Sequence, residues 1–257
     1  MLSIRGLSKH FGGVYANRDI DLEVADGELR GVIGPNGAGK STLFNLIAGH
    51  TRPDAGEISF DGRRIDRLPP HARARHGVAI VFQGARLFPG MSLLENVMVG
   101  AHAHSRAGLV AAVLRPPAQR REEREIRDYA EQCLDRVDLL GLADRPADGL
   151  PLGQQRRLQV ARALAGRPRL LLLDEPASGL RAAERTQLAD LVRELNSAGT
   201  SILLVEHDVG LVTSLAQRIT VLDLGKVIAD GTPTEVTSDP AVVKAYLGIG
   251  AEHAAHR

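Results

Sequence analysis

The chain has 257 residues, of which 25% are charged and 44% are apolar, and its net charge is +1. This length suits one large domain or a domain with a smaller lobe, and the composition is that of a soluble globular protein. No apolar run approaches the ~20 residues of a membrane-spanning helix, and the N-terminus shows no export signal. We therefore expect a cytoplasmic protein that reaches the cell membrane only as a peripheral subunit. The small net charge predicts no nucleic acid partner.

The N-terminal sixty residues predict a β-rich sheet. Apolar side chains alternate with polar ones at period two over 20–24, and the turn residues 26–27 close this strand. Residues 57–60 form a second strand pattern, followed by an Asp-Gly hairpin turn at 61–62. This sheet leads into a glycine-rich loop.

The loop over 34–42 reads Gly-Pro-Asn-Gly-Ala-Gly-Lys-Ser-Thr. Its glycines let successive backbone N–H groups curl toward phosphates, where a Cβ would obstruct the approach. Its lysine can reach the β- and γ-phosphates of a nucleotide, and the following serine can ligand Mg²⁺. An apolar strand pattern precedes the loop and a helical pattern follows it, which favours an anion site over a chance match. The predicted nucleotide-binding residues here are Gly34, Pro35, Asn36, Gly37, Ala38, Gly39, Lys40, Ser41 and Thr42.

A helical segment follows another strand pattern. Residues 78–82 are apolar, and Gln83 stands where that strand ends. Strand patterns then vanish over 92–150, where apolar residues recur at helical spacing and Pro116-Pro117 predicts a break. Cys133 lies in one apolar stripe of this segment, so we expect it to pack in the core.

Charged residues in this segment predict a solvated helix face. Five arginines are interleaved with three glutamates, a pattern more typical of an exposed helix than of a phosphate track. They are Arg115, Arg120, Arg121, Arg124 and Arg127, with Glu122, Glu123 and Glu125.

Strand patterns return over 170–173, 202–205 and 219–222. These strands are apolar at every position and are separated by helical patterns, which predicts a parallel sheet covered on both faces. An amphipathic helix between the first two ends at Gly199. A capping box at 232–235 and a proline at 240 predict two short helices near the C-terminus.

Two carboxylates follow the strand at 170–173. A buried strand would deliver Asp174 to the edge of the sheet, where it can hold the Mg²⁺ shared with Ser41. Glu175 points elsewhere and can polarise the water that attacks the γ-phosphate. The alternative is a solvated acidic turn, which the upstream phosphate loop disfavours.

Together these elements resemble the ATP-binding subunits of ABC transporters over nearly the whole chain. Three further features match that family: Gln83 after a strand, the segment 150–155 opening a helix, and His207 after a later strand. The resemblance implies that Gln83 touches Mg²⁺ and senses a membrane partner, that His207 contacts the γ-phosphate, and that Phe11 stacks on adenine. The implied catalytic residues are Glu175, His207 and Gln83, and the implied Mg²⁺ ligands are Ser41, Gln83 and Asp174.

The resemblance and the patterns agree on the fold. We predict an α/β fold with a P-loop NTPase core, which has a mixed, mostly parallel sheet, an N-terminal antiparallel β subdomain and an inserted helical lobe. The chain would be a single ABC-type ATP-binding domain over 1–257. The lobe would span about 92–165, and a short C-terminal helical extension about 232–257.

Two segments depart from the family pattern. In 150–155, Pro151 stands where the family has a serine that meets the γ-phosphate on the opposite subunit, and Leu152 replaces a glycine. Gly153 and Gln154 survive at the helix start, and the resemblance implies that they contact ATP bound to the opposite subunit. Arg181 stands where the family has aspartate or asparagine, and an arginine cannot accept the same hydrogen bonds.

The sequence after 154 is similar to ATPases of branched-chain or hydrophobic amino acid importers. This similarity implies an ATPase subunit that uses ATP and Mg²⁺ and pairs with a second ATPase subunit. The second subunit is an identical copy or a paralogue, and the similarity favours a paralogue. Its other partners would be integral membrane permease subunits and, indirectly, a solute-binding protein. Two alternatives stay open: a soluble ATPase that drives assembly of another complex, and a weakly hydrolysing regulatory subunit.

Contact with the permease would come from apolar residues near Gln83. Four side chains are candidates: Phe88, Met91, Leu93 and Leu94. For Leu93 and Leu94, packing inside the helical lobe is an equally good explanation, because an amphipathic stripe is core by default.

Overall fold

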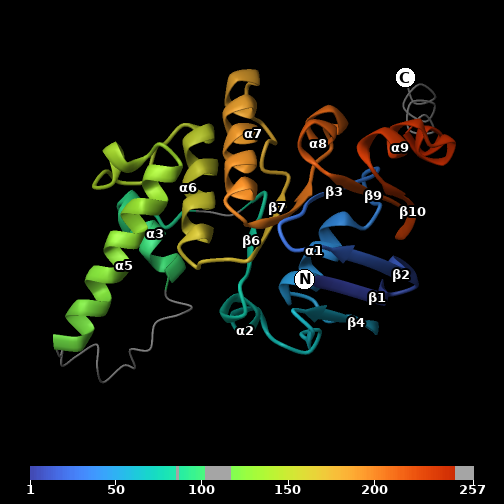
Figure 1. Cartoon of the computed structure of the whole chain (residues 1–257), viewed down its shortest axis with the longest axis horizontal. Coiled ribbons are helices and arrows are strands. Elements are labelled where there is room, and N and C mark those ends of the chain that lie inside the picture. Colours follow the sequence, from blue (N-terminus) through green and yellow to red (C-terminus); the bar gives the residue numbers. More distant parts are fainter. Residues whose placement is uncertain (85–86, 102–116, 247–257) are drawn as a thin grey trace.

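The computed structural model describes residues 1–84, 87–101 and 117–246, with the backbone alone at 117–120. Its strands form two sheets, and its helices lie on both sides of the larger one (Figure 1). The predicted α/β fold with a mixed, mostly parallel sheet and a separate N-terminal antiparallel sheet is confirmed.

The N-terminal sheet has the strand order β2-β1-β4-β5, and all of its pairs are antiparallel. Alternate residues of β2 point into the core, so Ile20, Leu22 and Val24 are buried as the period-two pattern predicts. The four strands are β1 (Leu2–Phe11), β2 (Val14–Val24), β4 (Ala55–Phe60) and β5 (Arg63–Arg64).

The larger sheet has the order β10-β9-β3-β8-β7-β6, in which every pair is parallel except β9 with β10. Every residue of β3, β7 and β8 is buried, as expected for strands covered on both faces. The six strands are β3 (Leu29–Ile33), β6 (Val78–Val81), β7 (Leu170–Asp174), β8 (Ser201–Val205), β9 (Arg218–Asp223) and β10 (Lys226–Gly231).

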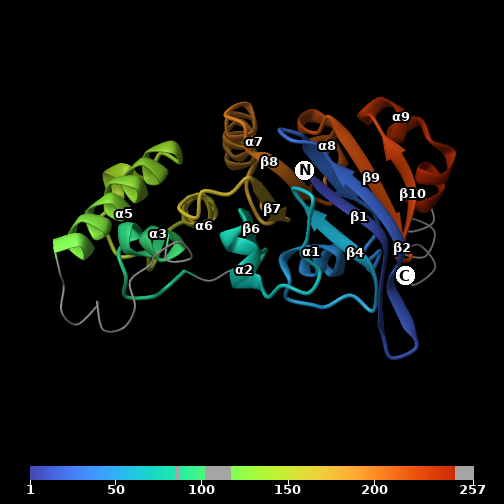
Figure 2. The same cartoon turned by 60° about the horizontal axis from the view of Figure 1, so that its bottom comes forward.

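The helices fall into two groups (Figures 1 and 2). One group packs around the larger sheet: α1 (Lys40–Ala48), α2 (Pro70–Arg75), α7 (Ala182–Ser197), α8 (Val209–Leu215) and α9 (Pro233–Ser238). The other group packs together at one side of the molecule: α3 (Leu93–Ala101), α5 (Pro117–Arg136), a 3₁₀ turn (Leu140–Leu142) and α6 (Leu152–Leu164). We refer to this second group as the helical lobe. Within the described residues, no helix has the length and apolar character that crossing a bilayer requires.

The positions of several residues in the helical lobe can be compared with those predicted from the sequence. Cys133 is buried in its core, as predicted. Leu93 and Leu94 are also buried, so they pack inside the lobe and do not form an outer contact surface. Helix α5 begins at Pro117, whereas Pro116 lies outside the described residues.

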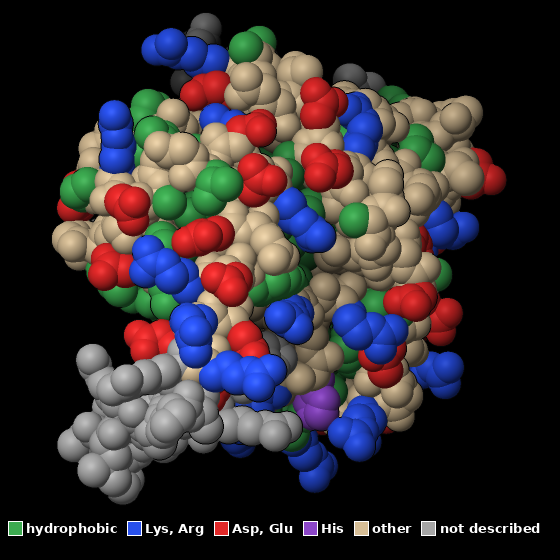
Figure 3. Space-filling model, turned by 60° about the vertical axis from the view of Figure 1, so that its left-hand side comes forward, with side chains coloured by type: hydrophobic (Ala, Val, Ile, Leu, Met, Phe, Trp, Pro, Cys, Tyr) green, Lys and Arg blue, Asp and Glu red, His purple; other side chains and the backbone are tan. Residues whose placement is uncertain are grey.

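The charged side of α5 is exposed, as the sequence pattern predicts. Arg121 pairs with Glu125 at 3.0 Å and Arg127 with Glu131 at 3.3 Å, both across one helical turn. Figure 3 shows basic and acidic side chains interspersed on this side of the molecule. Arg115 and the side chain of Arg120 lie outside the described residues.

The C-terminal part also follows the sequence pattern. Helix α9 starts with the predicted capping box, in which the Thr232 hydroxyl accepts from the Glu235 N–H and the Glu235 carboxylate accepts from the Thr232 N–H. A last helical segment covers 240–246, and residues 247–257 lie outside the described part.

Candidate nucleotide-binding site

The phosphate loop joins the buried strand β3 to helix α1. Gly34 and Gly39 have φ angles of +149° and +99°, which side chains rarely adopt. Neither position has room for one: a Cβ on Gly34 would lie 2.0 Å from the Leu222 carbonyl oxygen, and one on Gly39 would lie 2.1 Å from that of Ala16. The loop is therefore clamped between β9 and β2, with the N-terminus of α1 facing its concave side.

Lys40 opens helix α1 and bends back over the loop. Its Nζ donates to the carbonyl oxygens of Gly34 and Pro35 at 2.7 and 2.8 Å. Burial lowers the pKa of Lys40, and the charges of Glu175 and Asp174 oppose this change. The ammonium group thus lies within the field of both predicted acidic residues.

Asp174 ends strand β7 and is buried, with 9% of its surface exposed. Burial raises the pKa of Asp174, the charge of Glu175 raises it further, and Lys40 opposes both. Among the described residues no ion pair neutralises this carboxylate directly. A buried carboxylate without a counter-ion beside a phosphate loop fits a Mg²⁺ ligand, since Mg²⁺ is commonly held by one or two carboxylates together with phosphates and water.

Glu175 and Gln83 meet across adjacent parallel strands. The Gln83 Nε2 donates to Glu175 Oε2 at 2.8 Å and lies 3.3 Å from the Ser178 hydroxyl. Glu175 has a φ of +47°, so the chain turns immediately after β7. Strands β6 and β7 therefore bring together two predicted residues that are 92 positions apart in the sequence.

His207 follows β8, and its side chain is 62% exposed. Its Nδ1 lies 3.6 Å from the Glu206 carboxylate, which is completely buried. Glu206 accepts a hydrogen bond from the Ala177 N–H at 2.7 Å, just beyond the acidic pair, and burial raises its pKa. Glu206 was not identified from the sequence, because its partner is a backbone group that the fold alone brings close.

Phe11 ends β1 and is 56% exposed, with the Lys9 ammonium 5.4 Å from its ring centroid. The hairpin that carries it is tied to the phosphate loop by Asn17, whose Nδ2 donates to the Gly39 carbonyl at 3.2 Å. Asn17 is fully buried and was also missed by sequence reasoning. The exposed ring therefore stands on a hairpin fixed to the loop, an arrangement compatible with stacking on a base.

The segment 150–155 opens α6, with Pro151 as the residue that caps it. Gly153 is buried against α7, where an added Cβ would lie 2.6 Å from Glu184 Oε1. The other Glu184 oxygen accepts from the Arg181 N–H at 2.9 Å. Leu152 lies against Gly179: a Cβ added to Gly179 would be 3.0 Å from Leu152 Cδ2. The two departures from the family pattern are thus neighbours in space.

Arg156, one turn along α6, connects this segment to Gln83. Its guanidinium donates to the Gln83 carbonyl and, at 3.3 Å, to Gln159 Oε1. The contacts of Arg156 were not predicted from the sequence. The contact means that the helix beginning at the altered segment is joined to the residue that touches Glu175.

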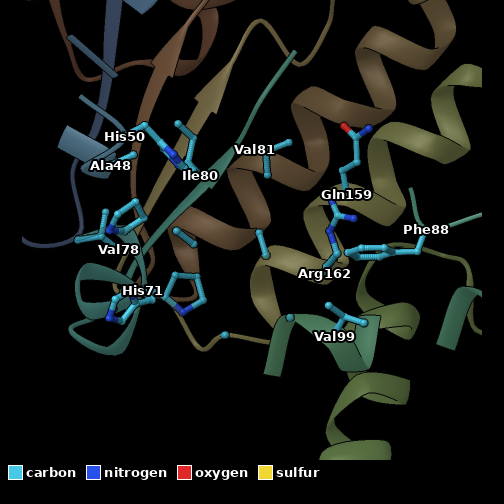
Figure 4. A pocket seen from close by; sticks show the side chains of 18 residues that line it. Ala48, His50, His71, Val78, Ile80, Val81, Phe88, Val99, Gln159 and Arg162 are labelled. Atoms are coloured by element: carbon cyan, nitrogen blue, oxygen red, sulfur yellow. The ribbon is translucent and has the colours of Figure 1, made fainter. Parts of the chain in front are cut away.

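A groove of about 470 Å³ opens between the lobe and the larger sheet beside β6 (Figure 4). Phe88 is 41% exposed in it, and the Arg162 guanidinium lies 5.4 Å from the Phe88 ring centroid. His50 and His71 line the opposite side (Figure 4). The groove is largely apolar with a few polar groups, as binding surfaces often are.

Two family models match the sequence: one described as ABC transporter over residues 17–178, and one described as Branched-chain amino acid ATP-binding cassette transporter over 226–252. The chain belongs to the ABC transporter family. As a member it is an ATPase whose hydrolysis of ATP is coupled to transport.

Similar proteins cover almost the full length of this ABC ATPase. The high-affinity branched-chain amino acid transport ATP-binding protein BraF of Pseudomonas aeruginosa is 44% identical, with 96% of this chain and 98% of that protein covered. The high-affinity branched-chain amino acid transport ATP-binding protein LivG of Escherichia coli is 42% identical, with the same shares of the two chains covered. The lipopolysaccharide export system protein LptB of Acidithiobacillus ferridurans is 35% identical, with 96% and 97% covered.

Solved structures share the fold. The ADP conformation of an ATP-binding cassette of an ABC transporter has a TM-score of 0.84 at 30% identity, with 96% of this chain and 98% of that chain covered. A dimeric cassette in a post-hydrolysis state bound to ADP and Pi has a TM-score of 0.76 at 27% identity, with 91% and 99% covered.

Proposed function

We propose that this chain is the ATP-hydrolysing subunit of a complex that imports branched-chain amino acids. The observation that carries the proposal is the 44% identity, over 96% of the chain, to a branched-chain amino acid transport ATP-binding protein. The match of residues 226–252 to a family model of the same description supports it from a separate part of the sequence.

The site geometry and the family resemblance together support the following catalytic roles. Glu175 orients and polarises the attacking water, and its hydrogen bond to Gln83 holds the carboxylate in place. Lys40 and His207 stabilise negative charge on the transferring phosphoryl group, and Phe11 stacks on the adenine. Asp174, Ser41 and Gln83 would hold Mg²⁺, which neutralises phosphate charge when it is bound. The role of each residue is part of the proposal.

The complete ATP site requires two ATPase subunits. Gly153 and Gln154 stand at the N-terminus of α6, and Gly153 packs against α7 in its own subunit. Helix N-terminal N–H groups can face an anion from outside, so we assign these residues to ATP bound by the opposite subunit. The dimeric form of a similar cassette supports this arrangement. The opposite subunit is a second copy of this chain or a paralogue.

Coupling to the membrane would use the groove beside Gln83. We propose that a segment of a permease subunit, exposed on the cytoplasmic face of the membrane, enters this groove and contacts Phe88. Val81 lines the groove two residues before Gln83, whose side chain binds Glu175 and whose carbonyl accepts from Arg156 of α6. The subunit would then be peripheral to the membrane and would meet a solute-binding protein indirectly, through the permease.

Co-purification with the permease tests this proposal. Phe88→Asp places a charge in the groove and should abolish capture of membrane subunits from detergent extract, while ATP binding is retained. Leu140→Asp is the matched control, because Leu140 has the same 41% exposure but lies in the 3₁₀ turn of the lobe, outside the groove. If the parent captures no membrane protein, or if both variants capture the permease equally, the proposed coupling is wrong. The first outcome would favour a soluble ATPase that assembles another complex.

A further inference from the structure

The last described helical segment, 240–246, packs on the larger sheet beside the phosphate loop. Asp239 caps this segment, because its Oδ1 accepts from the Ala241 N–H at 2.7 Å. Val242 is 5% exposed and belongs to the same hydrophobic core as Leu188 of α7 and Val212 of α8. Tyr246 follows one helical turn later on the same face and packs against the same core.

The phenol oxygen of Tyr246 is buried, yet no described residue gives it a hydrogen bond of normal geometry. A buried tyrosine hydroxyl usually has a partner, so this one calls for an explanation. Burial raises the pKa of Tyr246, and the backbone N–H of Gly34 lies close enough to the phenol to oppose that rise. The C-terminal segment therefore places a polar atom next to the first residue of the phosphate loop.

Gly34 connects this phenol to the catalytic lysine. Its carbonyl oxygen accepts from Lys40 Nζ at 2.7 Å, while its N–H faces Tyr246. Its backbone is also pressed against β9, since an added Cβ would lie 2.0 Å from the Leu222 carbonyl oxygen. Lys40 must turn toward the phosphates when ATP binds, and Gly34 then loses the lysine as a partner.

We propose that Tyr246 is a positioning residue for the phosphate loop, whose phenol oxygen accepts a hydrogen bond from the Gly34 N–H as Lys40 leaves the Gly34 carbonyl for the phosphates of ATP. The C-terminal segment would thereby help to hold the loop in the shape that receives a triphosphate. This segment lies outside residues 17–178, which match the general ABC transporter model. The inference depends on ATP binding and does not depend on the identity of the transported solute.

Tyr246→Phe in the full-length chain tests the proposal, because it removes the hydroxyl and keeps the packed ring. We expect KM for ATP and the Kd for Mg·ATP to rise roughly 3- to 10-fold, which corresponds to one lost hydrogen bond, with kcat unchanged. The denaturant midpoint should stay the same or rise, since a buried polar atom without a normal partner is removed. Lys244→Ala, on the exposed side of the same segment, is the matched control and should change none of these values.

The backbone amide of Gly34 provides a readout that does not depend on activity. In ¹⁵N-glycine-labelled protein with Mg·ATP, its resonance should move in Tyr246→Phe and stay in place in Lys244→Ala. An unchanged KM and Kd in Tyr246→Phe would overturn the proposal, even if the resonance moves. A fall in the denaturant midpoint that accounts for the whole change in binding would also overturn it, because the role would then be structural.

Discussion

The most specific structural prediction concerns Gly39, the N-cap residue of helix α1. Gly39→Ala would put a Cβ 2.1 Å from the Ala16 carbonyl oxygen and 2.7 Å from Asn17 Nδ2, both on β2. The Ala16 carbonyl is a backbone group, which cannot rotate out of the way as a flexible side chain can. Strand β2 must therefore move away from the loop. The variant also forces alanine to a φ of +99°.

A second glycine of the same loop allows the cost of backbone strain to be separated from the cost of the overlap with β2. Gly37 has a φ of +80°, but an added Cβ there would have no atom within 4 Å. Gly37→Ala should therefore cost about 1–2 kcal/mol of the free energy of unfolding, from backbone strain alone. Gly39→Ala adds steric overlap with β2, worth ~1–3 kcal/mol, so its total cost should be about 2–5 kcal/mol.

Urea unfolding of both variants measures the difference. The two substitutions should both weaken ATP binding, because each puts a Cβ into the phosphate loop, so stability is the informative quantity. We expect Gly39→Ala to be less stable than Gly37→Ala by about 2 kcal/mol. Equal losses would refute the reasoning, since contact with β2 would then contribute nothing to the choice of glycine at 39.

Three further predictions concern carboxylates and the thiol. Glu175→Gln should lower kcat for ATP hydrolysis about 10²- to 10⁴-fold while ATP stays bound, and hydrolysis at the parent rate in purified protein would contradict the role of Glu175. Glu206→Gln should raise the denaturant midpoint at pH 7 to 8, because burial raises the pKa of Glu206 and its ionised form opposes folding. In the parent this penalty is absent below pH 4.5, the ordinary pKa of the carboxyl, and it grows as the pH rises toward the pKa of the folded state. A denaturant midpoint of Glu206→Gln that is still above that of the parent at pH 3.5 would therefore contradict this explanation. Burial raises the pKa of Cys133 to about 11 from an ordinary 9.0, so alkylation by iodoacetamide at pH 8 should be at least about 100-fold slower in folded than in urea-unfolded protein, and comparable rates would be inconsistent with a buried thiol.

Local patterns predicted the parts of the fold whose signal lies within one segment. The phosphate loop, the apolar strands β7 and β8 and the capping box of α9 are of this kind. Strand β1 was harder to identify as a separate element, because register shifts follow Ile4 and Leu7 and break the period-two alternation. Gly6, with a φ of +56°, lies at the first of these irregularities.

Hydrogen bonds between side chains and backbone groups could not be predicted from the sequence. Arg73 on the short helix α2 is 1% exposed and donates to the carbonyl oxygens of Leu46 and Ile47 at the end of α1. Asn17, Arg156 and Glu206 likewise bind backbone atoms that only the folded chain brings within reach. A residue whose partner is a peptide group carries no complementary residue type in the sequence, so pattern analysis has no signal to detect.

Family resemblance supplied what spacing could not. The resemblance alone singled out Gln83, whereas Glu175 was already predicted from the buried strand and the phosphate loop. The hydrogen bond between Gln83 and Glu175, at the ends of neighbouring strands, was predicted by neither. The adjacency of Leu152 and Gly179 was not anticipated, since the altered segment and the turn before α7 were considered separately. The roles of these residues, like the boundaries of the lobe, remain predictions.

The central claim is that ATP hydrolysis by this chain is coupled to import of branched-chain amino acids. The most direct measurement is steady-state ATP hydrolysis by the complex of this chain with its co-purified membrane subunits, reconstituted in lipid with the solute-binding protein. We predict that leucine, isoleucine or valine accelerates hydrolysis, that aspartate does not, and that Glu175→Gln abolishes the acceleration. A hydrolysis rate that no amino acid changes, or that Glu175→Gln does not lower, would contradict the claim.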